Sequence, residues 1–165
     1  MIPRYRLLQE RIGQEWAEAR RAARKAQQAF EASRREADPA FLLDSVALNL
    51  HGFYNGVERA FEAISRELDG GLPSGQRWHR DLLDQMAYDL RDVRPPVIRP
   101  ATRDFLEEYM RFRHLIRNLY TWNLDPSLLE RRTASLPPTL GALGEDFEAF
   151  QRFLDTAAVA DETGE

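Results

Sequence analysis

The residues best suited to chemistry lie in the segment RFRHLIRNLY, which spans positions 111 to 120. This strongly helical segment carries three arginines, a histidine and a tyrosine, and arginine binds carboxylate and phosphate groups through paired hydrogen bonds. His114 and Asn118 lie one helical turn apart and point away from the apolar side of the helix. We therefore expect any functional site to include this segment.

A helical repeat of apolar residues sets the orientation of the same helix. Five side chains form one row suited to a protein core: Phe105, Tyr109, Phe112, Ile116 and Leu119. Arg113 and Tyr120 continue a neighbouring row that begins with Leu106 and Met110. Arg113 is therefore expected to be half-buried, and it then needs an anionic or carbonyl partner.

Length and composition predict one soluble domain with a real core, since the chain has 165 residues of which 43% are hydrophobic. The net charge of -4 argues against binding nucleic acid through bulk charge but leaves a local arginine patch open. All 23 basic residues except Lys25 are arginine. That bias fits either phosphate and carboxylate pairing or the codon usage of a GC-rich genome.

The residue inventory excludes several kinds of chemistry. There is no cysteine for a disulfide or a thiolate metal site. His51, His79 and His114 fall on three different predicted helices without a His-Glu-x-x-His pairing, so no metal is expected. The Gly70-Gly71 pair lacks the following lysine of a phosphate-binding loop, so no nucleotide cofactor is expected either.

The sequence shows no apolar leader at its start. It also has no apolar run that approaches the roughly 20 residues needed to cross a bilayer. We therefore expect a cytoplasmic protein in a reducing compartment, without contact to a membrane.

Helical periodicity recurs along the chain and strand alternation does not, which predicts an all-α, up-and-down bundle of about five helices. The expected helices cover residues 4 to 35, 39 to 68, 78 to about 90, and 102 to 120 or 122, with a final helical section from 126 that is interrupted at Pro137-Pro138. Residues 1 to 160 form a single domain in this reading, and residues 161 to 165 a frayed tail.

The second expected helix should be the centre of the core. Its apolar row is the longest in the chain: Leu43, Val46, Leu50, Phe53, Val57, Phe61, Ile64 and Leu68. Asp38 is the expected N-cap, with Pro39 at the first helical position. In the first helix Ala19, Ala23 and Ala26 form a seam of small residues, which indicates close contact with another helix.

Three segments resemble a known family when they are taken in order. LHGFYNGVERAFE at 50 to 62, DGGLPSGQRWHRDLLDQM at 69 to 86 and RFRHLIRNLYTWNLDP at 111 to 126 are similar to the HepT-like branch of the HEPN superfamily. The resemblance covers nearly the whole chain. It implies a helical bundle that forms a homodimer, and many such proteins are metal-independent ribonuclease toxins paired with a minimal nucleotidyltransferase antitoxin.

The family motif consists of an arginine and a histidine separated by four to six residues, and a tyrosine often follows two positions after the histidine. Arg113 and Tyr120 match the arginine and the tyrosine, while Asn118 stands where the histidine should be. No histidine of the chain has an arginine five to seven positions upstream. Asparagine cannot exchange protons near neutral pH, and acid–base assistance is worth about 10²–10⁴ in rate, so Asn118 predicts a weakened or absent nuclease.

Two functions remain open at this point. In the first the protein binds or weakly cleaves RNA, with Arg113 holding the phosphate, His114 or Asn118 replacing the usual base, and Tyr120 as the residue to which the antitoxin attaches AMP. In the second it is an inactive binding protein that docks a nucleotidyltransferase or a nucleotide, and Arg113 forms a buried ion pair.

Other residues of the chain have structural interpretations. Leu115 and Trp122 share the outer face of the fourth helix and favour a homodimer contact there. His51 is expected to be a partly buried structural histidine. His79, beside Trp78 near a helix start, is expected to be a surface or packing residue.

Overall fold

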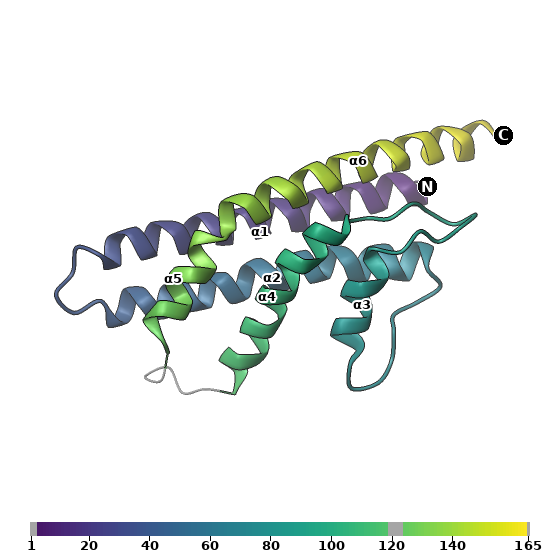
Figure 1. Ribbon diagram of the computed structural model, residues 1–165. Helices are drawn as coiled ribbons and strands as arrows, with labels where there is room; N and C mark the ends of the chain where they lie inside the picture. The colour runs from purple at the N-terminus through teal and green to yellow at the C-terminus, as the bar shows by residue number, and fades with distance from the viewer. Residues whose placement is uncertain (1–2, 119–123, 165) are drawn as a thin grey trace.

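The computed structural model describes residues 3–118 and 124–164. Within these residues the chain is helical and has no strand, which confirms the all-α class. The six helices are α1 Arg4–Ser33, α2 Ala40–Leu68, α3 Trp78–Met86, α4 Pro100–Arg117, α5 Pro126–Ala134 and α6 Leu136–Thr163. Figure 1 shows the long helices α1 and α6 running side by side, with α2 alongside α1 and the short helices α3, α4 and α5 packed across α2.

The core is built on α2, as the sequence predicts. From Val46 to Ile64 the predicted apolar row of α2 is completely buried. Leu43 and Leu68, at the two ends of the row, are half-buried. Because α2 contacts α1, α3, α4 and α5, it is the element that fixes where the other helices lie.

The alanine seam of α1 makes the predicted close contact. Ala19, Ala23 and Ala26 are fully buried, and α1 packs along α2. A Cβ atom added to Gly56 of α2 would lie 3.0 Å from the Cβ of Ala19 and 3.3 Å from its Cα. The two helices therefore approach at a point where only small residues fit.

The buried face of α4 differs from the predicted one at its start. Phe105 is 36% exposed, whereas Leu106, Tyr109 and Met110 are buried. The prediction placed Phe105 in the core row. Tyr109 of the predicted row packs on Phe53 of α2 with 5.2 Å between the ring centres, whereas Phe105 is left at the solvent edge. The row that carries Arg113 is consequently more deeply buried than the sequence alone suggested.

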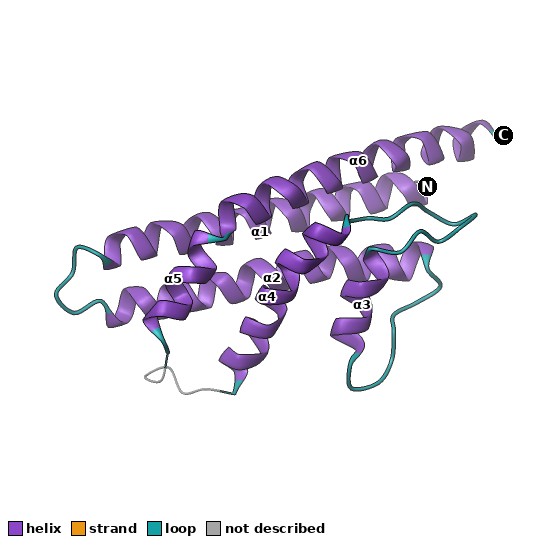
Figure 2. Ribbon diagram, viewed as in Figure 1, coloured by secondary structure: helices purple, strands orange, loops and turns teal. Residues whose placement is uncertain are grey.

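Several helix boundaries also differ from the predictions. The N-cap of α2 is Pro39, one residue after Asp38. The third helix ends at Met86 rather than near Leu90, because Leu90 pairs with Arg94 in an isolated β-bridge. Figure 2 shows the loops that follow α2 and α3 as two long connections beside α3.

The C-terminal section forms two helices, so the described chain has one helix more than expected. The break falls at Ser135, and Pro137 and Pro138 stand in the first turn of α6, where proline removes no helical hydrogen bond. α6 continues to Thr163, past residue 160, beyond which fraying is expected from the sequence. Within the described ranges, no helix is both long and apolar enough to span a membrane.

Candidate functional site

Arg113 of α4 faces α2 and is almost completely buried, with 5% of its surface exposed. Its Nη1 and Nη2 donate to Oε1 and Oε2 of Glu58, at 2.9 and 3.0 Å. Glu58 is equally buried, at 5% exposure. The expected anionic partner of Arg113 is therefore a glutamate of α2, bound in the two-pronged geometry that arginine favours.

Further contacts complete the surroundings of the guanidinium. Nη1 of Arg113 also donates to Oδ1 of Asn55 at 3.0 Å, and the guanidinium carbon lies 4.9 Å from the centre of the Tyr54 ring. Burial, with a smaller contribution from the Glu58 carboxylate, raises the pKa of Tyr54, so this ring stays neutral. Arg113 is thus held on several sides by α2.

His51 extends the same chain of contacts along α2. The amide Nδ2 of Asn55 lies 3.0 Å from Nδ1 of His51. Burial and the positive charges of Arg113 and Arg117 lower the pKa of His51, which keeps the ring neutral near pH 7. A neutral ring can accept the Asn55 amide proton. His51 therefore orients Asn55, which in turn orients Arg113, in agreement with the expected structural role of His51.

His79 joins this cluster from α3. Its Nδ1 lies 2.8 Å from Oε2 of Glu58 and 2.9 Å from Nη2 of Arg113. The ring stacks on Trp78, with 3.7 Å between the ring centres. The interpretation of His79 as a surface or packing residue missed this contact. The signal was present in the helical spacing, because His79 shares a face with the buried residues Leu83 and Met86.

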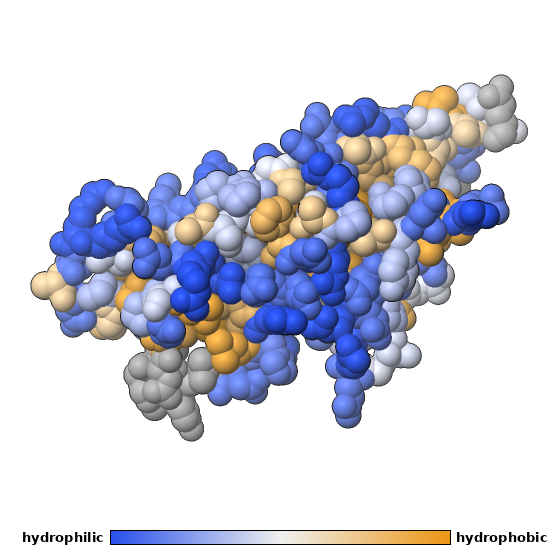
Figure 3. Space-filling model, viewed as in Figure 1, coloured by the Kyte–Doolittle hydropathy of each residue, from blue (hydrophilic) through white to orange (hydrophobic). Residues whose placement is uncertain are grey.

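A cleft of about 370 Å³ opens beside the cluster, between the start of α3 and the second half of α4. Most of the side chains that line it are basic. The lining residues are Gln76, Arg77, His79, Arg80, Met110, Arg111, Arg113, His114 and Arg117. No carboxylate is among them. Figure 3 shows hydrophilic side chains gathered over α3 and α4. The cleft is suited to an anionic ligand, although the whole chain carries a net charge of -4.

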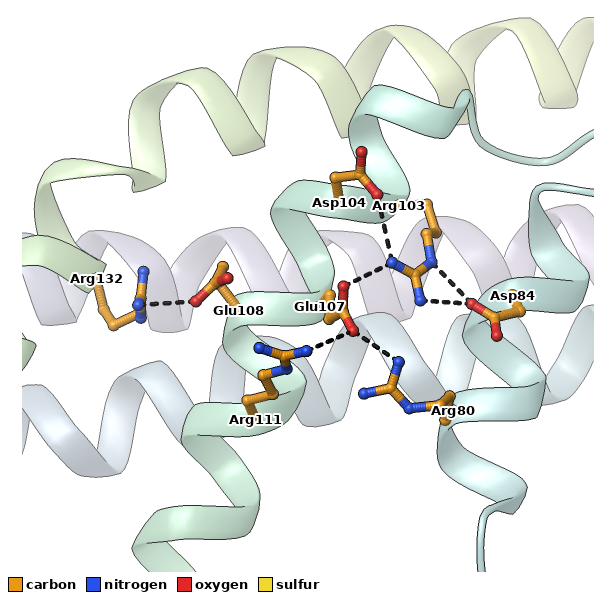
Figure 4. A network of polar contacts seen from close by, with 8 residues as sticks. All are labelled: Arg80, Asp84, Arg103, Asp104, Glu107, Glu108, Arg111 and Arg132. Carbon is orange, nitrogen blue, oxygen red and sulfur yellow. Dashed lines mark hydrogen bonds and ion pairs between the residues drawn. The ribbon is translucent and has the colours of Figure 1, made fainter.

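Two of the cleft arginines are tied to a carboxylate outside the cleft. Glu107 of α4 accepts from Arg80 of α3 at 2.6 Å, from Arg103 at 2.7 Å and from Arg111 at 3.2 Å. Figure 4 shows Glu107 at the centre of this network, with Arg103 bridging to Asp84 of α3. The bonds from Arg80 and Arg103 lower the pKa of Glu107 to about 2. The network fixes α3 against α4 and hence the width of the cleft.

Two further arginines of the cleft are available for a ligand. Arg77 and Arg117 form no ion pair within the part of the chain that the structure describes. Arg80 and Arg111 share the charge of Glu107, and Arg113 is paired with Glu58. An anion entering the cleft would therefore meet Arg77 and Arg117 as its first unpaired partners.

The predicted site residues are only partly brought together. Arg113 and His114 both line the cleft. Asn118 does not line it; it stands at the C-cap of α4, where its Nδ2 donates to the carbonyl of His114 at 2.9 Å. Tyr120 lies outside the described residues. Leu115 is exposed, as expected for a contact surface, while its predicted neighbour Trp122 is also outside the described residues.

Metal binding finds no support in the same region. Among the described residues there is no group of three or more histidine, aspartate and glutamate side chains that could hold a metal ion.

These features define a class of protein: an all-α bundle whose fourth helix carries a buried arginine beside a basic cleft. The comparison with known families identifies the family to which this bundle belongs. A family model described as HepT-like protein matches residues 45–154 of the 165, and the chain belongs to this HepT-like family. The matched region contains every residue that lines the cleft. No curated protein and no solved structure matches the chain.

Proposed function

We propose that this protein is the RNA-directed component of a toxin–antitoxin pair, and that it binds RNA in the cleft between α3 and α4 and cleaves it weakly without a metal. The observation that carries the proposal is the cleft itself, which has five arginines and two histidines and no carboxylate on its lining. Arginine matches the geometry of phosphate, and phosphate contacts supply most of the affinity of a protein for a nucleic acid backbone.

Within this proposal the arginines have different tasks. Arg77 and Arg117 bind phosphate, because neither is committed to a carboxylate among the described residues. Arg113 lies deeper, and a phosphate that took it over would have to displace the bidentate contact with Glu58. Arg113 therefore supports the floor of the cleft, and its charge is balanced by Glu58. His114 lies at the exposed rim, and Asn118 at the adjoining helix end.

The expected partners belong to the same proposal. A homodimer through the outer face of α4 would cover Leu115, which is 40% exposed, and would bring two clefts together. A minimal nucleotidyltransferase antitoxin would regulate the protein by attaching AMP to Tyr120. Sedimentation at micromolar concentration tests the dimer, since a monomer would contradict it. Mass spectrometry of the protein co-expressed with its genomic neighbour tests the modification.

A second function is favoured by a specific observation. Asn118 replaces the motif histidine, and Arg113 is fully engaged in an ion pair, which fits an inactive protein that docks a nucleotidyltransferase or a nucleotide. The substitution Asn118→His separates the two functions. A rise in RNA cleavage, by up to about 10²–10⁴, would show a nuclease site that lacks only the motif histidine, whereas a protein that only binds should show no cleavage before or after the change.

The proposal is tested by RNA binding, measured as fluorescence anisotropy over a range of salt concentrations with a chelator present. The double variant Arg77→Gln/Arg117→Gln should bind at least tenfold more weakly. The slope of its plot of log affinity against log salt concentration should be smaller in magnitude by about 1.4, since each phosphate contact on a single strand contributes about 0.7 to this slope.

The matched control is Arg21→Gln/Arg24→Gln, which removes the same charge from exposed positions of α1 away from the cleft. This control should bind RNA like the wild type. Equal losses in both double variants would show that binding depends on charge in general, and no binding by the wild type would overturn the proposal.

A further inference from the structure

We propose that His79, held by Glu58, is the acid–base group of the cleft and takes the task that Asn118 cannot perform. This inference rests on the proposed function, because it needs RNA in the cleft. It assigns proton transfer to a residue of α3 that lies outside the arginine–histidine motif of α4.

The imidazole of His79 is fixed from three directions. Glu58 and Arg113 contact its Nδ1 at 2.8 and 2.9 Å, and Trp78 stacks on the ring at 3.7 Å between centres. Glu58 itself is held by the bidentate contact with Arg113. A ring fixed in this way presents its opposite edge, which carries Nε2, in one orientation, and proton transfer requires such positioning.

The contacts at Nδ1 accommodate both neutral forms of the ring. When Nδ1 carries the proton, it donates to Oε2 of Glu58. When Nδ1 is bare, it accepts from Nη2 of Arg113. Nδ1 therefore has a partner in either form. In the form whose Nδ1 donates to Glu58, Nε2 is bare and can accept a proton, and the imidazolium that results can give this proton up from Nε2 while Nδ1 keeps its contact with Glu58.

Nε2 is also the part of the ring that is free to act. His79 lines the cleft, and its side chain is 31% exposed. Its Nε2 makes no hydrogen bond within the described residues, whereas Nδ1 is turned to the buried pair. Arg77 and Arg117 line the same cleft. An RNA phosphate bound by these arginines would thus lie in the space that Nε2 faces.

The reaction balances without a metal or a second reactant. Nε2 of His79 takes the proton of a ribose 2′-hydroxyl, the 2′-oxygen forms a bond to phosphorus, and the bond from phosphorus to the 5′-oxygen breaks. The proton passes from His79, directly or through water, to the departing 5′-oxygen. The products are a 2′,3′-cyclic phosphate and a 5′-hydroxyl end. The cleft arginines stabilise the negative charge that gathers on the phosphate during the step.

His114 is less suited to the same task, although it lines the same cleft. Its side chain is exposed, and within the described residues no hydrogen bond is made to its ring; only its backbone carbonyl accepts, from Asn118. Among the described residues, no second group sets its orientation or its tautomer. His79 has all three supports that His114 lacks.

The test compares His79→Asn with the wild type, using one RNA for binding and for cleavage with a chelator present. Asparagine keeps an N–H group near the position of Nδ1 and removes Nε2. We expect unchanged folding, RNA binding within twofold and a loss of cleavage of at least 100-fold. Free imidazole should restore part of the cleavage in His79→Ala. His79→Gln serves as the second variant should the asparagine variant fail to fold.

The possible outcomes separate the inference from the proposed function. Absence of RNA binding by the wild type overturns both. Binding without cleavage, or cleavage that survives in His79→Asn, overturns the role of His79 and leaves RNA binding in place. A loss in His114→Asn as large as that in His79→Asn also overturns it. Products without a 2′,3′-cyclic phosphate, or cleavage of an RNA with 2′-deoxyribose at the cut site, contradict the reaction.

Discussion

Replacing Glu58 by glutamine should destabilise the protein strongly, because the change leaves the guanidinium of Arg113 buried without a counter-ion. The two side chains are only 6% and 7% exposed and are joined by two contacts of 2.9 and 3.0 Å. Removing one partner of such a pair costs about 3–5 kcal/mol. Charges about 3 Å apart at an effective dielectric constant of about 20 attract by roughly 5 kcal/mol, which is compatible with that range.

The measurement is urea unfolding followed by circular dichroism. With a slope of about 2 kcal/mol per molar urea for a domain of this size, the midpoint of Glu58→Gln should fall by roughly 1.5–2.5 M. The matched control is Glu31→Gln, which breaks the pair with Arg35 whose side chains are 59% and 74% exposed. That change should alter stability by no more than about 0.5 kcal/mol.

A double variant identifies the origin of the loss. Glu58→Leu combined with Arg113→Met removes both charges, and it should be more stable than either single variant because neither charge is left buried alone. The reasoning is refuted if Glu58→Gln costs less than about 1 kcal/mol, or if the double variant loses the sum of the two single changes. The result also bears on any cleavage test that replaces Arg113, since cleavage lost on its replacement could reflect lost folding.

Three further predictions concern the surrounding fold. The pKa of Glu107 is lowered to about 2 from an ordinary 4.5, so its ion pairs stabilise the fold fully above about pH 4.5 and progressively less as the pH falls toward 2. In urea titrations, Glu107→Gln should therefore cost about 1–2 kcal/mol at pH 7 and clearly less at pH 3. The same cost at both pH values would contradict this. Arg94 forms a buried ion pair with Asp69 at 2.7 Å. Arg94→Met should lower the free energy of unfolding by about 3–5 kcal/mol in urea titrations, because it leaves the Asp69 carboxylate buried without a counter-ion, and a loss below about 1 kcal/mol would count against that account. Gly56→Ala should cost about 1–3 kcal/mol in thermal melts because its methyl group meets Ala19 at 3.0 Å, whereas Gly13→Ala, with open space around it, should stabilise α1 by up to about 1 kcal/mol.

The fold could be predicted from the sequence where one strong periodic signal was present. The row from Val46 to Ile64 identified the central helix, and the small residues of α1 identified its closest contact. The orientation of α4 was harder. Tyr109 and Phe112 of the predicted row are buried, and so is the neighbouring row that carries Arg113. Phe105, at the start of the predicted row, lies at the solvent edge, because the packing partner rather than the apolar pattern decides how far a buried face extends.

The site could be predicted only as far as Arg113 and its need for a partner. The chain has 27 acidic residues, and nothing in the local sequence marks Glu58 as the one that meets Arg113 from a different helix. The role of His79 depends on the same tertiary contact. The sequence predicted His79 only as a surface or packing residue, because the carboxylate that gives this position chemical meaning comes from α2. Contacts between helices far apart in sequence carry no local signal.

The contacts of Glu58 make stability and chemistry inseparable at most positions of the cluster. Glu58 holds Arg113 through both of its oxygens, and one of these oxygens also contacts Nδ1 of His79. A change at Glu58 or Arg113 would therefore disturb the packing of α4 on α2 together with the orientation of the imidazole. His79 lies at the end of this chain of contacts, with one edge in the cleft, and so its Nε2 can be removed while the buried pair stays intact. For this reason His79 is the position at which activity can be lost without loss of the fold.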